Sequence, residues 1–218
     1  MPDERLLCIA SMVRENGRVA DIGTDHAYLP IHLVQTGRCP SAIASDVRVG
    51  PTESARRNVA EAGLSLRIDV RLGDGLSGIS PDEVDDIVIA GMGGETIAAI
   101  LEAAAWVQNP RYRLVLQPMT RAEELRRYLL TNGFSIRTEQ VIRDGHRLYT
   151  VMTAAYTAQA PVTDETQYYR GALGKEGRAY LEKEVERLKK KQEGCCRAGH
   201  TEDALHWQHL IEALEADV

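Results

Sequence analysis

The sequence predicts an α/β protein built on an open, mostly parallel β-sheet. Five short apolar stretches alternate with amphipathic helical stretches as far as residue 130, and two more strand-like stretches follow with no helix between them. Parallel βαβ units connect right-handedly and place helices on both faces of a sheet. Aromatic residues make up only 5% of the chain, which favours the aliphatic core that such sheets have.

Each expected element is bounded by its own local signals. Asn16, Gly37 and Gly63 follow three of the helical stretches, as stop signals do. Asp144-Gly145 joins the last two strand-like stretches and predicts a hairpin, which inserts one antiparallel strand into the sheet. The expected strands are 18–22, 41–45, 68–72, 86–90, 112–116, 135–142 and 148–155. The expected helices before the hairpin are 4–15, 28–36, 52–61, 95–105 and 121–130.

The chain is expected to divide into two units, residues 1–157 and 167–218. The stretch between them is polar and contains a proline, as linkers do. The second unit has two amphipathic stretches, 167–193 and 202–216, with apolar residues at roughly heptad spacing. This spacing predicts a small helical hairpin that resembles a short coiled coil.

The bulk composition predicts a soluble cytoplasmic protein. The four cysteines include no C-x-x-C pair, so we expect reduced thiols and neither disulfides nor a metal site. No stretch has the ~20 apolar residues that span a bilayer. The net charge is -6, which argues mildly against a nucleic-acid partner unless basic residues cluster locally.

Polar residues and glycines gather where the strands are expected to end. In an open parallel sheet, ligands bind outside the carboxyl ends of the strands, near the point where the strand order reverses. We therefore expect the site at this edge. The segments concerned are Asp21 to Pro30, Asp46, Gly73 to Leu76, Gly91 to Gly94, and Gln117 to Met119.

The loop after the first strand favours S-adenosylmethionine (SAM) over a dinucleotide. A dinucleotide site needs the G-x-G-x-x-G pattern, and here Gly23 is the one glycine. The carboxylate of Asp25 would repel a pyrophosphate, whereas Asp21 or Asp25 can face the cationic parts of SAM. Asp46, at the end of the second strand, can bind a ribose diol or simply cap a turn.

The turn after the third strand supplies a further candidate contact. Asp74 can accept a hydrogen bond from the exocyclic amine of an adenine, with the apolar side chain of Leu76 near the ring. An aspartate in a tight turn also has a purely structural use.

Three segments together resemble the bacterial tRNA (adenine-22-N1)-methyltransferase family. They are Asp21 to Pro30 (DIGTDHAYLP), Ile89 to Gly94 (IAGMGG) and Leu116 to Pro118 (LQP). The resemblance covers about residues 4–155, and the helical tail is similar to the small C-terminal domain of that family. It implies a Rossmann-like seven-stranded methyltransferase sheet, SAM as the methyl donor and tRNA as the substrate.

The resemblance also implies roles for individual residues. Many relatives carry Q-P-N after the fifth strand, where this chain has Met119, which packs against a base but cannot hydrogen-bond it as asparagine does. The implied cofactor-binding residues are Arg5, Asp21, Gly23, Asp25, Asp46, Asp74, Gly75, Leu76, Gly91 and Met92. The implied substrate-binding residues are Gln117, Pro118, Met119, Arg121 and Arg147.

Methylation of adenine N1 produces a cationic base, so a carboxylate near the N6 amine would both orient the base and stabilise its growing charge. Asp25 is the first candidate for this role. His26 can orient the base or relay a proton, and Tyr28 can stack on it, although both can equally be structural. Since N1 lies on the Watson–Crick edge, the adenosine must be unpaired or flipped out.

Basic residues cluster in spite of the negative total. Residues 167–200 contain nine Lys or Arg against five Glu, including Lys189 to Lys191. These residues are expected to contact RNA phosphates or to form a solvated helix face. A second basic set follows the fifth strand: Arg121, Arg126, Arg127, Arg143, His146 and Arg147.

Three other functions compete with tRNA adenine methylation. The chain could methylate another RNA base or a small molecule with SAM, and Met119 keeps this alternative open. A NAD-dependent oxidoreductase is disfavoured by the single glycine of the first loop. A non-catalytic RNA-binding or assembly protein is disfavoured by the presence of Asp25, Asp46 and Asp74.

Overall fold

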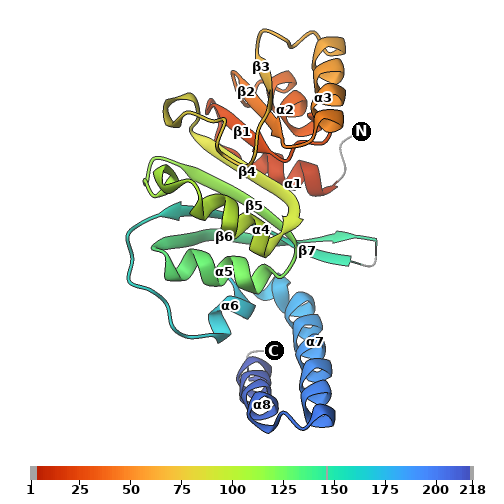
Figure 1. The fold of residues 1–218 in the computed structure, drawn as a ribbon, viewed down its shortest axis with the longest axis vertical. Coiled ribbons are helices and arrows are strands. Elements are labelled where there is room, and N and C mark those ends of the chain that lie inside the picture. Colours follow the sequence, from red (N-terminus) through yellow and green to blue (C-terminus); the bar gives the residue numbers. More distant parts are fainter. Residues whose placement is uncertain (1–3, 146, 217–218) are drawn as a thin grey trace.

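The computed structural model describes residues 4–145 and 147–216, so the predicted basic residue His146 lies outside the described residues. Its strands are β1 (Val19–Ile22), β2 (Ala42–Asp46), β3 (Ile68–Leu72), β4 (Asp86–Gly93), β5 (Arg113–Thr120), β6 (Phe134–Asp144) and β7 (Arg147–Tyr156). They form one seven-stranded sheet in the order β3-β2-β1-β4-β5-β7-β6 (Figure 1). β7 is antiparallel to both of its neighbours, which confirms the predicted fold class.

Helices cover both faces of the sheet, as βαβ units require (Figure 1). Alternate strand residues point to opposite faces. Val19 and Ala42 pack with α1, α2 and α3, whereas their neighbours Ala20 and Ile43 pack with α4 and α5. The bounds of these helices are α1 (Glu4–Met12), α2 (Tyr28–Gln35), α3 (Val49–Glu61), α4 (Gly94–Glu102) and α5 (Ala122–Thr131).

Two central strands are longer than the sequence predicts. β4 continues to Gly93 and β5 to Thr120, so Gln117, Pro118 and Met119 lie in a strand and not in the loop after it. β4 and β5 stay paired over this stretch because their register shifts on both sides of Met92, which lies opposite Pro118. Such an irregularity accommodates a proline, which cannot donate to the ladder.

The predicted continuous helix over residues 167–193 is wrong. A short helix, α6 (Thr166–Arg170), ends at Gly171, and a 3₁₀ turn (Lys175–Gly177) precedes α7 (Arg178–Ala198). Gly171 has φ 60°, and a Cβ there would lie 2.1 Å from Glu139 Oε2, so the break needs glycine.

The predicted helical hairpin is present as α7 and α8 (Thr201–Glu215), which pack together beyond α5 and α6 (Figure 1). The turn between them lies at Gly199, with φ 77°, and Gly194 lies inside α7. Leu181, Val185 and Leu188 form a separate apolar cluster with residues of α8. The division of the chain into two domains stays a prediction.

A buried ion pair joins α5 and β6 to the segment that leads into α7. Arg126 donates to Glu139 Oε1 at 2.6 Å, and their side chains are 1% and 0% exposed. Arg126 also donates to the Tyr168 carbonyl, while Glu139 accepts from the Ala172 amide. Arg126 is therefore a structural residue, and its predicted contact with an RNA phosphate is wrong.

We predict that Glu139→Leu lowers the free energy of unfolding by about 3–5 kcal/mol, because it leaves the Arg126 charge buried without its counter-charge. Urea unfolding followed by circular dichroism measures this change. The double variant Arg126→Met/Glu139→Leu should recover most of the loss. A loss below about 1 kcal/mol for the single variant would show that the pair does not hold this region together.

Candidate functional site

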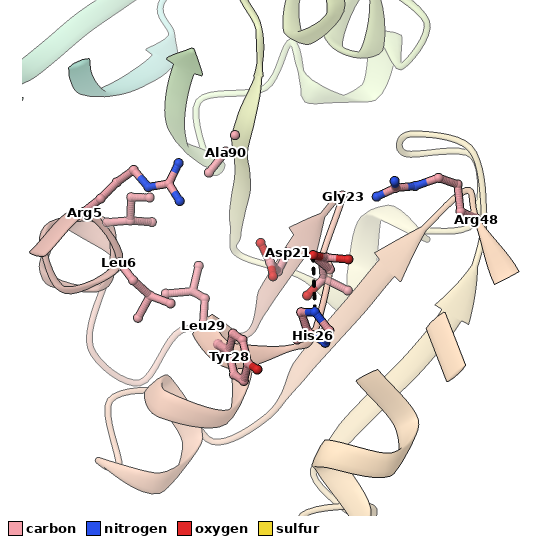
Figure 2. Close-up of a pocket in the computed structure, with 13 residues that line it drawn as sticks. Arg5, Leu6, Asp21, Gly23, His26, Tyr28, Leu29, Arg48 and Ala90 are labelled. Carbon is pink, nitrogen blue, oxygen red and sulfur yellow. Dashed lines mark ion pairs between the residues drawn. The ribbon is translucent and has the colours of Figure 1, made fainter. Parts of the chain in front are cut away.

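A cavity of about 400 Å³ opens at the carboxyl edge of the sheet, beside the ends of β1 and β4. The strand order reverses here, because β1 connects towards β2 while β4 connects towards β5. α1 closes one side of the cavity, and the start of α2 closes another (Figure 2). The structure brings seven of the predicted residues to this cavity: Arg5, Asp21, Gly23, Asp25, His26, Tyr28 and Gly91.

Asp21 is the buried acid of the cavity. It lies in β1, is 7% exposed and interacts with Thr24. Burial raises the pKa of its carboxyl group to about 6, and the nearby negative charge of Asp46 acts in the same direction. A positive charge in the cavity would therefore meet a carboxylate that has no cationic partner among the described residues and that favours one.

The loop that follows β1 is held by hydrogen bonds to neighbouring segments. The amides of Gly23 and Thr24 donate to the Ser45 carbonyl at 2.7 and 3.0 Å. The Asn58 side chain donates to the His26 carbonyl at 2.9 Å. Ala27 then adopts left-handed φ and ψ angles of 57° and 25° at the start of α2. Such strain in a residue other than glycine is typical of functional loops.

His26 contacts each of the other two predicted catalytic residues, Asp25 and Tyr28. His26 Nε2 is 3.4 Å from the carboxylate of Asp25, the interaction drawn as a dashed line in Figure 2. The rings of His26 and Tyr28 stack with centroids 5.2 Å apart. Asp25 and Tyr28 are exposed, at 66% for the Asp25 side chain and 60% for Tyr28. The cluster therefore presents an acidic acceptor and an aromatic ring to an incoming molecule.

Arg48 is a cavity residue that the sequence prediction missed. Arg5 and Arg48 lie on opposite sides of Asp21 (Figure 2). The Arg48 amide and guanidinium both donate to Asp46 Oδ1, at 2.8 and 3.3 Å. Its place two residues after the predicted ribose ligand was an available signal. Thr24 and Leu29 also line the cavity. They belong to the predicted segment Asp21 to Pro30, but the sequence prediction gave them no individual role.

Five of the predicted cofactor residues do not line the cavity. Asp46 is buried beside it, and Asp74 is exposed in the turn after β3. Gly75 faces Ile100, and Leu76 belongs to the core. The fifth, Met92, lies over Gly23, because a Cβ on Gly23 would be 2.0 Å from the Met92 methyl carbon.

Gln117 and Arg5 connect β5 to the cavity. Arg5 Nη1 donates to Gln117 Oε1 at 3.4 Å and to Met119 Sδ at 3.3 Å. Gln117 Oε1 also accepts from the Gly91 amide at 3.1 Å. The N-terminal helix is thereby tied to the ends of β4 and β5.

The remaining substrate-binding candidates lie elsewhere. Pro118, Met119 and Arg121 line a second cavity of about 300 Å³ beside the first. Arg147 is exposed at the start of β7, where its guanidinium interacts with the Tyr149 hydroxyl.

In the part of the chain that the structure describes, no helix is long and apolar enough to cross a membrane. Those same residues contain no cluster of His, Cys, Asp and Glu that would hold a metal ion.

The chain is similar to known methyltransferases along most of its length. A methyltransferase-domain family model matches residues 3–152. The tRNA (adenine(22)-N(1))-methyltransferase of Bacillus subtilis is 40% identical over 151 residues, which span 69% of this chain and 63% of that enzyme. The curated relative is thus matched over less than two thirds of its length.

Solved structures extend the likeness to the helical tail. The structure of the B. subtilis m1A22 tRNA methyltransferase superimposes with a TM-score of 0.89, at 28% identity, over 99% of this chain and 98% of that one. A putative tRNA (m1A22) methyltransferase from Streptococcus pneumoniae, in complex with SAM, gives a TM-score of 0.81 at 33% identity, over 97% and 100%. This chain therefore belongs to the methyltransferase-domain family, in the group of the bacterial tRNA (adenine-22-N1)-methyltransferases.

Proposed function

We propose that this chain transfers a methyl group from SAM to N1 of adenosine 22 in tRNA. The observation that supports this most is the acidic segment from Asp21 to Tyr28, which lies at a cavity where the strand order reverses. The likeness to the B. subtilis enzyme over 99% of the chain supports the same substrate.

The residues of the cavity fit SAM. Its sulfonium and amino groups are cationic, and the cavity offers the carboxylates of Asp21 and Asp25. Gly91 has φ 79°, and nothing lies within 4 Å of the position where a Cβ would be, so the backbone is open to a ligand there. The buried carboxylate of Asp46 lies next to this space and suits a ribose diol.

The chemistry asks for little acid or base catalysis. SAM supplies an electrophilic methyl group, and the neutral adenine N1 supplies the attacking lone pair. Asp25 accepts a hydrogen bond from the N6 amine and attracts the base more strongly as positive charge develops. Tyr28 stacks on the adenine, and His26 keeps Asp25 and Tyr28 in place through the contacts described above. Together these residues hold N1 in line with the methyl group.

A second candidate function is SAM-dependent methylation of another RNA base. Met119 favours it, because its thioether is a weak acceptor that does not select adenine. Both candidate functions place the protein in the cytoplasm with RNA as its partner, and neither requires a metal ion.

We predict that the protein forms N1-methyladenosine in unmodified tRNA, and that Asp25→Ala lowers the rate of transfer about 100-fold or more through lost charge stabilisation. Labelled methyl transfer from SAM, with nucleoside digestion of the product, measures both effects. Asp69→Ala removes a comparably exposed carboxylate in β3 and serves as the control. SAM binding without any N1-methyladenosine would refute the adenine assignment, and methylation of a different base would support the second candidate.

The raised pKa of Asp21 leads to a prediction of two opposite effects. Its pKa of about 6 exceeds the ordinary aspartate value of 3.8, so the folded state binds more protons between these values and stability falls as pH rises through this window. Asp21→Asn should therefore stabilise the ligand-free protein at pH 8 by about 1–3 kcal/mol. The same change should weaken SAM binding, because a cation loses its counter-charge.

Urea unfolding at pH 5 and pH 8, together with calorimetric SAM titrations, measures these effects. The wild-type protein should bind SAM more tightly at pH 7.5 than at pH 5.5, and Asp21→Asn should remove this dependence. If Asp21→Asn is less stable than wild type at pH 8, the buried Asp21 carboxylate does not lower the stability of the folded protein, which contradicts this assignment.

The structure distinguishes the three consecutive lysines of α7. Lys189 pairs with Glu215 and Lys191 lies over the Trp207 ring, so both hold α8. No ion pair of Lys190 occurs among the described residues. We predict that Lys190→Ala weakens tRNA binding a few-fold. It should also lower, by about 1, the slope of the logarithm of the binding constant against the logarithm of the salt concentration, as the loss of one phosphate contact does.

Filter binding over a range of salt concentrations measures the Lys190 effect. Lys189→Ala is the matched control, because the charge of Lys189 is already balanced by Glu215. Equal salt slopes for wild type and Lys190→Ala would remove this face of α7 from the RNA interface.

A further inference from the structure

The second cavity separates the methyltransferase sheet from α7, and we call it the β5–α7 cavity. It has a volume of about 300 Å³. Pro118 and Met119 of β5 form one wall, and Tyr180, Glu184 and Arg187 of α7 form the opposite wall. The start of α5 and the first residues of β7 complete it. The cavity thus lies between the sheet and α7, which is joined to the start of α5 by the ion pair of Arg187 and Glu123.

The charges around the β5–α7 cavity are balanced. Arg187 donates to Glu123 at 2.8 Å and to Glu184 at 2.7 Å. Arg121 pairs with Glu95 at 2.8 Å. Every arginine that lines the cavity therefore has a carboxylate partner, so an uncharged polar ring fits this space better than a phosphate group.

One polar group of the cavity has no partner. Thr150 lines it and is 1% exposed, and its hydroxyl makes no hydrogen bond within the described residues. Buried hydroxyls almost always have a partner, so this one calls for an explanation. Tyr180 adds a buried aromatic side chain to the α7 wall. A hydrogen-bonding group near an aromatic side chain is typical of nucleobase sites.

The backbone beside the cavity is strained. Arg121 has φ 53°, in the left-handed region. A Cβ on Gly94 would lie 2.1 Å from the Arg121 carbonyl oxygen, so this turn is packed tightly against α4. Ala27 shows the same left-handed conformation beside the first cavity. Strain of this kind persists where the surrounding structure fixes a functional geometry.

The β7 side of the β5–α7 cavity, where Thr150 lies, is too far from the first cavity for the reacting base. β7 lies two strands from β4, so the part of the cavity formed by Thr150 is roughly 10 Å from β4 at ~4.8 Å per strand. The reacting nitrogen must come within ~3–3.5 Å of the methyl carbon beside β1 and β4. Met119 lines this cavity and contacts Arg5 of the first one, so the two spaces share a wall.

We propose that the β5–α7 cavity receives the nucleobase of a nucleotide adjacent to the target adenosine, with the Thr150 hydroxyl bound to its polar edge. This inference rests on the proposed function and names a second recognition site for the same RNA. It gives α7 a direct part in selecting the substrate, through Tyr180 and Arg187.

The test combines Thr150→Val with RNA that lacks one base. In wild type, an abasic nucleotide on one side of the target should lower kcat/KM about tenfold, as the loss of a seated base does. Thr150→Val should lower kcat/KM about three- to tenfold for intact RNA and have little effect on the abasic RNA. Thr131→Val, at the far end of α5, removes a threonine hydroxyl without touching the cavity and serves as the control. Affinity for SAM should be the same in all of these proteins.

The outcomes separate this inference from the proposed function. Equal effects of Thr150→Val on intact and abasic RNA, or no effect of either abasic position in wild type, would overturn the inference while methylation persists. If wild type forms no N1-methyladenosine, the proposed function fails, and binding of RNA with 2-aminopurine beside the target decides the inference instead. A fluorescence change with wild type that Thr150→Val abolishes supports the cavity as a base site, and no change at either neighbour refutes it.

Discussion

The parallel pairing of β1 with β4 is the constraint on which the rest of the site depends. Val19 to Ile22 pair in register with Asp86 to Ile89, and the chain leaves these two strands towards opposite ends of the sheet. Their carboxyl ends therefore bound a crevice that no crossover covers. Asp21 is buried because it belongs to a four-residue strand with neighbours on both sides. The burial of the Asp21 carboxyl group, and with it the raised pKa, is thus a consequence of strand order.

The helical tail depends on a different interaction. The buried pair of Arg126 and Glu139 fixes the segment around Gly171, from which α7 starts. Removing both charges from water is costly, so such a pair contributes more to a defined geometry than to net stability. Its effect here is to place α7 across the β5–α7 cavity from the end of β5, and the pair of Arg187 and Glu123 joins α7 to α5. The tail and the substrate edge form one surface as a result.

The features that followed from local patterns were predictable, and those that depend on distant contacts were not. Alternation of strand and helix signals was enough for the sheet and for the hairpin of β6 and β7. The break at Gly171 escaped prediction because its cause is Glu139, a residue on another element. Arg126 looks like a surface cation on an amphipathic helix, and only its partner explains its burial. Arg48 was missed because it acts through Asp46, although the two are close in sequence.

Met119 lies between the two cavities, and residues of both are needed to recognise the RNA. Asparagine at this position would offer a base both a donor and an acceptor, whereas the thioether is a weak acceptor already occupied by Arg5. Selectivity for the target base must then come from the groups on either side of Met119. Asp25 and Tyr28 present charge and an aromatic ring on one side, and on the other side Thr150 has a hydroxyl with no hydrogen-bond partner among the described residues. Because a site with buried polar groups rejects a base that leaves them unpaired, the less specific residue is tolerable between two more specific ones.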